Sequence, residues 1–199
     1  MTDPSLRELM GVVGSGPNSA DDLDRTQARV AMHRVLDDGT DPTTLGAFLL
    51  ANRWKRNTPE ELAGFLDVMR EESVRTATPA VDAVDCGANY DGKAETAIHG
   101  VGAGIVAAAA GTPVIIHSGD RVPVQEADAY KHVLEELGVE TALAPAESAR
   151  MVEETGVGFY YQPRFNPSLE ALLPRRRAMG VRTFLNTIET LANPANATV

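Results

Sequence analysis

The sequence predicts an α/β protein in which an N-terminal helical bundle precedes a partial parallel α/β domain. Two observations predict this class. Residues 1–75 carry repeated helix-start signals separated by short loops, and residues 81–121 read as strand, loop, helix and strand in that order. Parallel strands need a crossover of about a dozen residues or more, whereas an antiparallel return does not.

The first 75 residues are predicted to form four helices, the first of which is short and amphipathic. Ser19 reads as the N-cap of a helix that reaches residue 37. Asp41, before a proline, and Thr58, which opens a Thr-Pro-Glu-Glu capping box, repeat the start signal. Four helices with short loops indicate a bundle. His33 is expected at its boundary rather than in a ligand site, because it lies one turn after the apolar Val30 and one turn before the charged Asp37.

The strand–loop–helix–strand unit is the part of the chain where a ligand site is expected. A strand at 81–85 precedes a loop, a helix of small apolar residues at 97–110 and a second strand at 113–117. Its part at 101–110 is apolar on all sides, so we expect this part to be a buried core helix. Ligands bind at the carboxyl ends of parallel strands, where the loops 86–96 and 117–122 are expected to meet.

The rest of the chain is predicted to alternate helices with one more strand. The expected elements are a helix at 122–137, a strand at 139–143, a helix at 146–155, an aromatic crossing segment at 158–167, a helix at 168–179 and a helix or strand-like segment at 181–192. Tyr160, Tyr161 and Phe165 are expected to pack between layers. Three strands leave an unpaired edge, so either another chain or residues beyond 199 cover it.

Composition restricts the functional classes. The net charge is −10 with only three lysines, which disfavours binding to a polyanion, although adaptation to a salty cytoplasm would also explain an acidic, lysine-poor surface. The single cysteine, Cys86, excludes internal disulfides and argues against a cysteine-based zinc site. No apolar run is long enough to span a bilayer and the start lacks a signal sequence, so a cytoplasmic location without membrane contact is expected.

The loop after the first strand is suited to binding an anion. Gly87 and Gly92 allow backbone N–H groups to approach a phosphate, and Asn89, Asp91 and Lys93 lie beside them. Neither the dinucleotide-binding motif nor the P-loop motif is present, so a structural glycine turn remains an alternative.

The polar residues that follow the second strand leave the same choice open. His117, Gly119, Asp120 and Arg121 either contact a phosphate or sugar or cap a turn. In the run Arg175 to Arg177, successive helical residues point about 100° apart, so at most one or two of them enter a cleft.

Long motifs spread over the whole chain resemble the anthranilate phosphoribosyltransferase family, which is related to the pyrimidine nucleoside phosphorylases. These motifs are TPEELAGFLDVMRE, AAAAGTPVIIHSGDR, VLEELGV, ETGVGFYYQPRFNPSLEALLPRRRAMGVRTFLN and NPANA. The resemblance implies a helical bundle, a phosphoribosyl-binding α/β domain, helices from 146–180 that pack back on the bundle, and a homodimer formed through the helical domain. It also implies Mg²⁺-dependent transfer of ribosyl 5-phosphate from phosphoribosyl diphosphate to an amine or base.

The resemblance carries over to some site residues and not to others. Gly119 and Arg121 match the family's Lys-His-Gly-Asn-Arg turn, while His117 and Asp120 are replacements within it. Arg176 aligns with the arginine that faces the aromatic acceptor. The family's Gly-Thr-Gly-Gly-Asp loop is absent, and its acidic pair for magnesium would fall beyond residue 199.

The loop that replaces the glycine-rich motif resembles a paralogous branch. Tyr90-Asp91-Gly92-Lys93 is similar to that branch, for which anthranilate is not the accepted substrate and nucleic-acid binding has been proposed. Thr96 lies where the family's next helix normally begins with Asn and Ser-Thr.

These observations lead to one main hypothesis and two alternatives. The first is a phosphoribosyltransferase of the anthranilate type with magnesium as cofactor, and the alternatives are a non-catalytic relative that binds nucleic acid or another anion, and a structural or dimerisation fragment. The expected divisions are a helical bundle at 1–75, the first part of the α/β phosphoribosyl-binding domain at 76–145, helices that return to the bundle at 146–180, and the start of the remaining α/β part at 181–199. The predicted substrate-binding residues are Gly87, Asn89, Asp91, Gly92, Lys93, Thr96, His117, Gly119, Asp120, Arg121 and Arg176.

Overall fold

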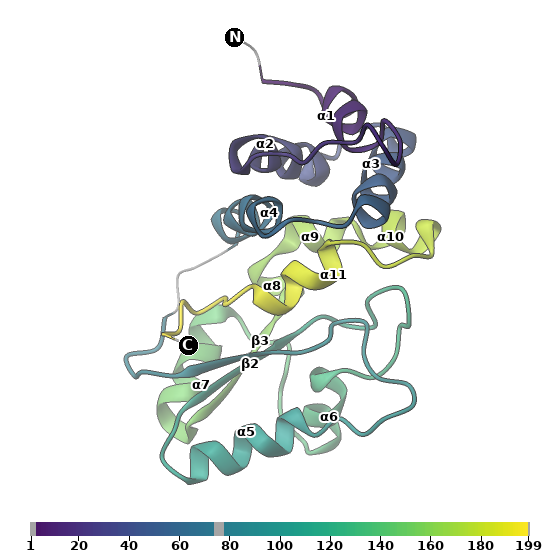
Figure 1. The fold of residues 1–199 in the computed structure, drawn as a ribbon. Helices are drawn as coiled ribbons and strands as arrows, with labels where there is room; N and C mark the ends of the chain where they lie inside the picture. Colours follow the sequence, from purple (N-terminus) through teal and green to yellow (C-terminus); the bar gives the residue numbers. More distant parts are fainter. Residues whose placement is uncertain (1–2, 74–77, 199) are drawn as a thin grey trace.

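The computed structural model describes residues 3–73 and 78–198, and these form a helical bundle followed by an α/β domain (Figure 1). The bundle contains α1 (Leu6–Val13), α2 (Arg25–Leu36), α3 (Pro42–Lys55) and α4 (Pro59–Glu71). The sequence therefore predicted the fold class correctly. Asp41 and Thr58 cap α3 and α4 as expected, and Thr58 forms the predicted capping box with Glu61.

The predicted start of the second helix is wrong. Asp24 caps α2, where its side chain accepts a hydrogen bond from the Gln27 backbone N–H. Ser19 instead belongs to a turn in which its hydroxyl donates to the Ser15 carbonyl oxygen. The chain cannot start α2 earlier because the Leu23 N–H is held by the buried Glu61 carboxylate at 2.9 Å.

Helices α2 and α4 pack so closely that one glycine is required between them. A Cβ atom at Gly64 would lie 2.6 Å from the Arg25 carbonyl oxygen and 2.7 Å from the Ala28 Cβ. Arg25 also pairs with Asp67 across the same contact at 2.8 Å. The two helices are therefore joined by a close backbone approach and by ion pairs at its edge.

We expect Gly64→Ala to lower the free energy of unfolding by about 1–3 kcal/mol, because the added methyl group overpacks the contact between α2 and α4. Gly46 in α3 is the matched control, since a Cβ there meets nothing within 4 Å. Gly46→Ala should stabilise the protein by up to about 1 kcal/mol through helix propensity. Urea denaturation followed by circular dichroism measures both, and equal effects at the two sites would contradict this packing.

The α/β domain is built on a sheet of three parallel strands in the order β1-β2-β3. The strands are β1 (Val84–Gly87), β2 (Val114–Ser118) and β3 (Val157–Tyr161). The crossover helices on its far side from the bundle are α5 (Gly100–Ala109) and α6 (Tyr130–Glu136). Helix α7 (Pro145–Thr155) leads into β3 and packs on it.

Short helices fill the space between the sheet and the bundle (Figure 1). They are α8 (Gln162–Phe165), α9 (Pro167–Ala171), α10 (Leu173–Met179), α11 (Leu185–Ile188) and the 3₁₀ turn η1 (Glu189–Leu191). Phe184 stacks on Phe65 of α4 with ring centroids 4.0 Å apart. The Asn166 side chain donates to the Met69 carbonyl oxygen at 3.0 Å. These short helices therefore pack back on the bundle.

Alternating residues of β2 belong to two different hydrophobic cores. Ile115 joins the large core shared with the bundle, whereas Val114 and Ile116 join a smaller core under α5 and α6. His117, next in the alternation, lies on the bundle side against Phe165. The pleat of one strand therefore places a histidine at the junction of the sheet and the helical layer.

The expected third strand is in the wrong place. Residues 139–143 form no strand, because local hydrogen bonds involving Glu135 and Glu140 hold this segment in a loop. β3 instead lies in the segment expected to be a crossing. Gly156, with φ of 78°, ends α7 and directs the aromatic residues of β3 into the sheet. The helix expected at 122–137 is also shorter, since α6 begins only at Tyr130.

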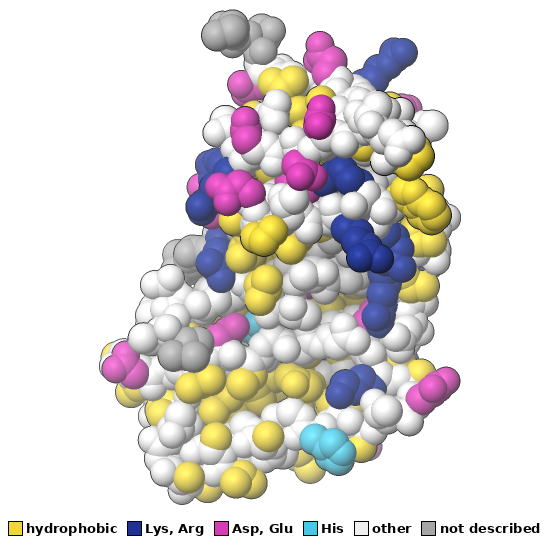
Figure 2. All heavy atoms as spheres, viewed as in Figure 1, with side chains coloured by type: hydrophobic (Ala, Val, Ile, Leu, Met, Phe, Trp, Pro, Cys, Tyr) yellow, Lys and Arg dark blue, Asp and Glu magenta, His cyan; other side chains and the backbone are white. Residues whose placement is uncertain are grey.

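The interpretation of the 101–110 segment as a buried core helix is wrong. Only Val101 and Gly104 of α5 are buried, whereas Val106 is 69% exposed and Ile105 is also exposed. Figure 2 shows hydrophobic side chains gathered over the lower part of the molecule, where α5 lies. The sheet covers one side of α5 only. Among the described residues, no helix combines the length and apolar character needed to cross a membrane.

Candidate functional site

The tips of β1 and β2 lie side by side, as the sequence predicts. Gly87 and His117 are partners in the parallel register, and the Ala88 N–H donates to the His117 carbonyl oxygen at 3.1 Å. The loops that leave the two tips also meet, because the Lys93 N–H donates to the Asp128 carbonyl oxygen at 2.9 Å. The loops 88–99 and 119–129 are therefore in contact at the carboxyl ends of the strands.

Directly between the tips, the space is filled by a buried chain of hydrogen bonds. The Tyr90 hydroxyl lies 2.5 Å from His117 Nδ1, and His117 Nε2 lies 3.1 Å from Asp85 Oδ2. Because a carboxylate only accepts, Nε2 carries the proton, and Tyr90 donates to Nδ1. Burial raises the pKa of Tyr90, so the phenol keeps the proton that it donates. We call this Tyr90–His117–Asp85 chain the relay.

Two glycines beside the relay are held by close packing. A Cβ atom on Gly87 would lie 2.1 Å from the Thr190 carbonyl oxygen, and one on Gly92 would lie 2.3 Å from the Ala127 carbonyl oxygen. Gly92 also has φ of 79°, which favours glycine. η1 therefore covers the end of β1, and Gly87 and Gly92 are required by the protein's own packing.

Asp91 and Arg176 are buried in ion pairs with other parts of the chain. Asp91 accepts a hydrogen bond from Arg182 Nε at 2.6 Å. Arg176 of α10 is 4% exposed and pairs with Glu189 of η1, which is 1% exposed. Arg176 Nη1 donates to one Glu189 oxygen, and Nη2 donates to the other at 3.0 Å. The Arg176–Glu189 pair joins two elements of the helical layer. The Arg182–Asp91 pair ties that layer to the loop after β1.

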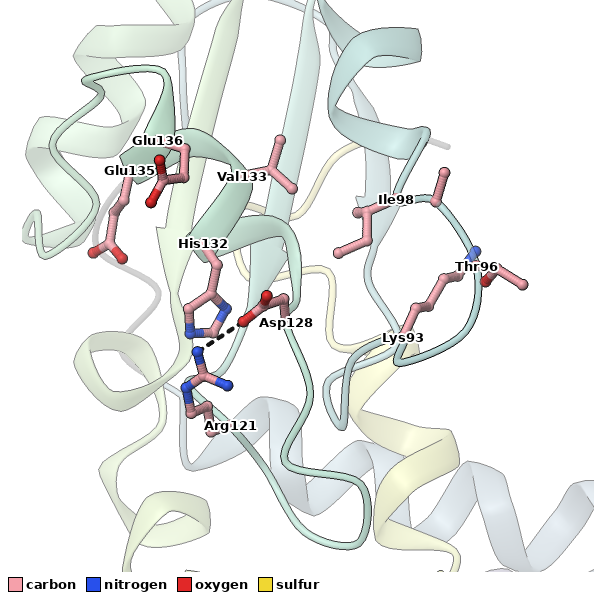
Figure 3. A pocket seen from close by; sticks show the side chains of 10 residues that line it. Lys93, Thr96, Ile98, Arg121, Asp128, His132, Val133, Glu135 and Glu136 are labelled. Carbon is pink, nitrogen blue, oxygen red and sulfur yellow. Dashed lines mark hydrogen bonds and ion pairs between the residues drawn. The ribbon is translucent and has the colours of Figure 1, made fainter.

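A cavity of about 520 Å³ opens between the two loops (Figure 3). Lys93 and Thr96 come from the loop after β1, and Arg121 comes from the turn after β2. Arg121 Nη2 binds Asp128 Oδ1 at 2.8 Å, which holds its guanidinium at the cavity wall. The lining residues are Lys93, Thr96, Ala97, Ile98, Arg121, Asp128, His132, Val133, Glu135 and Glu136.

The cavity has a cationic side and an acidic side. Lys93 and Arg121 provide the positive charge, part of which the Asp128 carboxylate offsets, while Glu135 and Glu136 of α6 lie at the other end in Figure 3. The hydrogen bond from Lys131 lowers the pKa of Glu135, which keeps that carboxylate charged. An anion is therefore attracted to one side of this cavity and repelled from the other.

His132 and Asp120 organise the wall between the two sides. His132 Nδ1 accepts the Ala129 N–H at 3.0 Å and so caps the start of α6. Its Nε2 therefore carries the proton and donates to Asp120 Oδ1 at 3.1 Å. Lys131 Nζ also binds Asp120, at 3.3 Å. Gly119 packs beneath this turn, because a Cβ there would lie 2.6 Å from Val122.

The predicted site residues thus fall into groups. Lys93, Thr96 and Arg121 line the cavity, and Asp120 supports its wall. Asn89 is exposed on the loop and donates weakly to the Gly92 carbonyl oxygen at 3.4 Å. The remaining predicted residues are buried or closely packed, namely Gly87, Asp91, Gly92, His117, Gly119 and Arg176. Their roles in substrate binding stay predictions.

Sequence reasoning missed the wall of the cavity contributed by α6 and the loop before it. Asp128, His132, Glu135 and Glu136 lie in a stretch that the sequence predicts as one continuous helix. The available signal was local: His132 follows Ala129 by three residues, the spacing at which a side chain caps a helix. That spacing indicates where α6 begins but not that it faces a cavity.

No group of three or more His, Cys, Asp or Glu side chains suited to a metal ion occurs among the described residues. The expectation that the metal ligands lie beyond residue 199 stays a prediction.

Two family profiles match the chain along almost its whole length. The profile described as "Glycosyl transferase family, helical bundle domain" matches residues 12–73, and "Glycosyl transferase family, a/b domain" matches residues 77–199. The chain belongs to this glycosyl transferase family.

Curated relatives within the family carry the name anthranilate phosphoribosyltransferase. The protein of Methanopyrus kandleri is 36% identical over 178 residues, which are 89% of this chain and 52% of the relative. That of Halobacterium salinarum is 38% identical over 195 residues, which are 96% of this chain and 55% of the relative. The chain thus spans about half the length of these relatives.

Solved structures of the same name have a similar fold. The enzyme of Thermus thermophilus superposes with a TM-score of 0.80 at 26% identity, covering 98% of this chain and 56% of that one. The Saccharomyces cerevisiae enzyme, solved in complex with PRPP and Mg, superposes with a TM-score of 0.77 at 17% identity, covering 95% of this chain and 55% of that one. At 17% identity the second comparison shows the fold alone.

Proposed function

We propose that the chain provides the phosphoribosyl-binding side of a phosphoribosyltransferase, which moves ribosyl 5-phosphate from phosphoribosyl diphosphate to anthranilate or a related aromatic amine or base. The observation that carries this proposal is the cavity at the carboxyl ends of β1 and β2, where Lys93 and Thr96 come from the loop after β1 and Arg121 comes from the turn after β2. Family membership supplies the reaction class.

The proposed role of the cavity is electrostatic. Bond breaking at the sugar carbon leaves a diphosphate with growing negative charge, and fixed cations lower the energy of that state. Arg121 is held by Asp128, so its charge is already positioned before a ligand arrives. Lys93 contributes a second cation, and its backbone is anchored by the Asp128 carbonyl oxygen.

The proposal includes magnesium because the resemblance to the family implies it, and not because the cavity provides a metal site. The yeast relative was solved with PRPP and Mg. The described residues offer no three-ligand cluster, and the proposal places no magnesium ligand among them.

We also propose the homodimer through the helical bundle that the resemblance implies. Its support is an exposed apolar strip on α3, where Leu50 is 50% exposed and Trp54 is 84% exposed one turn further on.

Nucleic-acid binding gains no support from the arginine run. Arg175 donates to the Asp38 carbonyl oxygen, Arg176 pairs with Glu189 and Arg177 pairs with Glu126. The three side chains are thus engaged with three different parts of the protein and do not share one groove.

Isothermal titration calorimetry with phosphoribosyl diphosphate and Mg²⁺ tests the proposal, with the protein expressed from its complete gene. We expect saturable binding that Lys93→Gln or Arg121→Gln weakens roughly tenfold or more, because each removes a charge-assisted hydrogen bond worth about 1.5–3 kcal/mol. Arg150→Gln is the matched control, since Arg150 is exposed on α7 away from the cavity. An absence of binding heat, or equal weakening by the control, would contradict the proposal.

A further inference from the structure

One short segment of the chain, residues 126–129, holds both cationic residues of the cavity. Arg121 Nη1 donates to the Glu126 carbonyl oxygen at 3.2 Å, and Arg121 Nη2 binds the Asp128 carboxylate at 2.8 Å. The Asp128 carbonyl oxygen accepts the Lys93 N–H at 2.9 Å, which fixes the backbone of that lysine. The positions of Lys93 and Arg121 therefore depend on where the 126–129 segment lies.

His132 fixes the end of this segment. Its Nδ1 accepts the Ala129 N–H at 3.0 Å, and its Nε2 donates to Asp120 Oδ1 at 3.1 Å. Asp120 belongs to the turn after β2, next to Arg121 in the chain. In Figure 3 the His132 ring and the Arg121 side chain point toward one another. One imidazole ring thus joins the 126–129 segment to the turn that carries the arginine of the cavity.

This arrangement requires the neutral form of His132. A neutral imidazole offers one acceptor and one donor, and the Ala129 N–H and the Asp120 carboxylate use one each. A protonated ring has two donors, so Nδ1 could no longer accept the Ala129 N–H. Protonation would also bring a second positive charge toward Arg121. Histidine is the side chain whose charge ordinarily changes between about pH 5 and 8.

Charged groups of both signs surround the ring. Asp120 has partners besides His132, because Lys131 Nζ lies 3.3 Å from its Oδ2 and the Tyr161 hydroxyl lies 3.5 Å from the same oxygen. This carboxylate therefore does not depend on a charged imidazole. The acidic groups that face the ring or line the same cavity are Asp120, Asp128, Glu135 and Glu136, and the basic groups are Lys93, Arg121 and Lys131.

We propose that His132 is a positioning residue of the cavity: its neutral form holds Lys93 and Arg121 where they bind phosphoribosyl diphosphate, and its protonation releases the 126–129 segment and weakens that binding. The inference rests on the proposed function and adds to it a dependence on pH. His132 acts through Ala129 and Asp120 and takes no part in bond making.

Two substitutions separate the position of the ring from its charge. His132→Asn places an amide oxygen near the position of Nδ1, so it can keep the hydrogen bond from Ala129, and it does not titrate. His132→Ala removes both hydrogen bonds. His33→Asn is the matched control for the loss of a histidine, since His33 is half-exposed on α2 in the bundle.

Isothermal titration calorimetry with phosphoribosyl diphosphate and Mg²⁺ tests the inference on the protein expressed from its complete gene. Between about pH 7.5 and about pH 5.5, we expect the original protein and His33→Asn to lose at least about fivefold more affinity than His132→Asn. Titration of the ligand's own phosphates cancels in this comparison, because it is common to all the proteins. His132→Ala should bind weakly at both values. An equal loss in His132→Asn, or unchanged binding in His132→Ala, would overturn the inference.

Nuclear magnetic resonance of the ring nitrogens tests the same arrangement without a ligand. We expect His132 to carry its proton on Nε2 at about pH 7.5, and the Ala129 amide to lose protection from hydrogen exchange at about pH 5.5 in the original protein but not in His132→Asn. A proton on Nδ1, or equal protection in both proteins, contradicts the role of His132.

The two proposals fail in different ways. If none of the proteins binds phosphoribosyl diphosphate, the proposed function fails, and the resonance measurement alone decides whether His132 holds the segment. If all of them bind it with the same dependence on pH, only the role of His132 fails.

Discussion

Replacement of Arg176 by methionine is expected to lower the free energy of unfolding by about 3–5 kcal/mol, because it leaves the Glu189 carboxylate buried without a counter-charge. Arg176 is 4% exposed and Glu189 is 1% exposed, so water cannot take over the lost interaction. Urea denaturation monitored by tryptophan fluorescence and circular dichroism measures the change. The effect should be large relative to the total stability of a domain of this size.

The double variant Arg176→Met with Glu189→Leu is the matched control. Removing both charges together should restore most of the lost stability, since hydrophobic residues of similar volume often replace a buried ion pair at little cost. If Arg176→Met alone lowers the free energy of unfolding by less than about 1 kcal/mol, the ion pair with Glu189 does not hold Arg176 in place, and its guanidinium remains free for a ligand.

Replacement of His117 by leucine is expected to cost roughly 2–5 kcal/mol, because both ends of the relay lose their partner. Tyr90 and His117 are completely buried and the Asp85 side chain is 9% exposed. Without His117, little water could therefore reach the phenol and the carboxylate to replace the lost hydrogen bonds. The loop from 88 to 92 should also loosen, since Tyr90 holds it against the strand tips. Hydrogen exchange of the loop amides measures this second effect.

Two further substitutions calibrate the relay. Tyr90→Phe removes one hydrogen bond and should cost about 1–3 kcal/mol, less than the loss of His117. His33→Gln should change stability by less than about 0.5 kcal/mol, because His33 is half-exposed on α2. Similar losses at His33 and His117 would show that the relay does not hold the strand tips together.

The order of elements was predictable from the sequence wherever a local rule decides the structure. Thr58 and Asp41 act on their own next turn, so their caps were found by spacing alone. Ser19 has the same residue type as a cap and failed, because the contact of Leu23 with Glu61, 38 residues away, keeps the chain extended until Asp24. A partner so distant in sequence leaves no mark on the local pattern.

The third strand and the exposed helix show a second limit. β3 carries aromatic residues that suit a strand, but the prolines after it favoured a crossing segment, and only pairing with β2 decides between them. α5 is apolar on all sides, and such a helix is expected to be buried on all sides. The sheet covers one side only, so Val106 remains exposed.

The candidate site was located by topology but not in detail. Parallel strands bring their carboxyl ends together, so the meeting of Gly87 and His117 followed from strand order. The sequence does not reveal that Tyr90 turns inward onto His117 or that Glu189 reaches back to Arg176. These contacts join residues 27 and 13 positions apart through tertiary packing. They fill the space between the strand tips and the helical layer, and the accessible cavity is lined by Lys93 and Arg121 instead.

The most direct test of the proposed donor site is a crystal structure of the protein soaked with phosphoribosyl diphosphate and Mg²⁺. We predict electron density for the diphosphate within hydrogen-bonding distance of the Lys93 and Arg121 side chains, with the Tyr90–His117–Asp85 relay intact. Density at Arg176 with Glu189 displaced, or density between the strand tips with Tyr90 turned out, would contradict the proposed site.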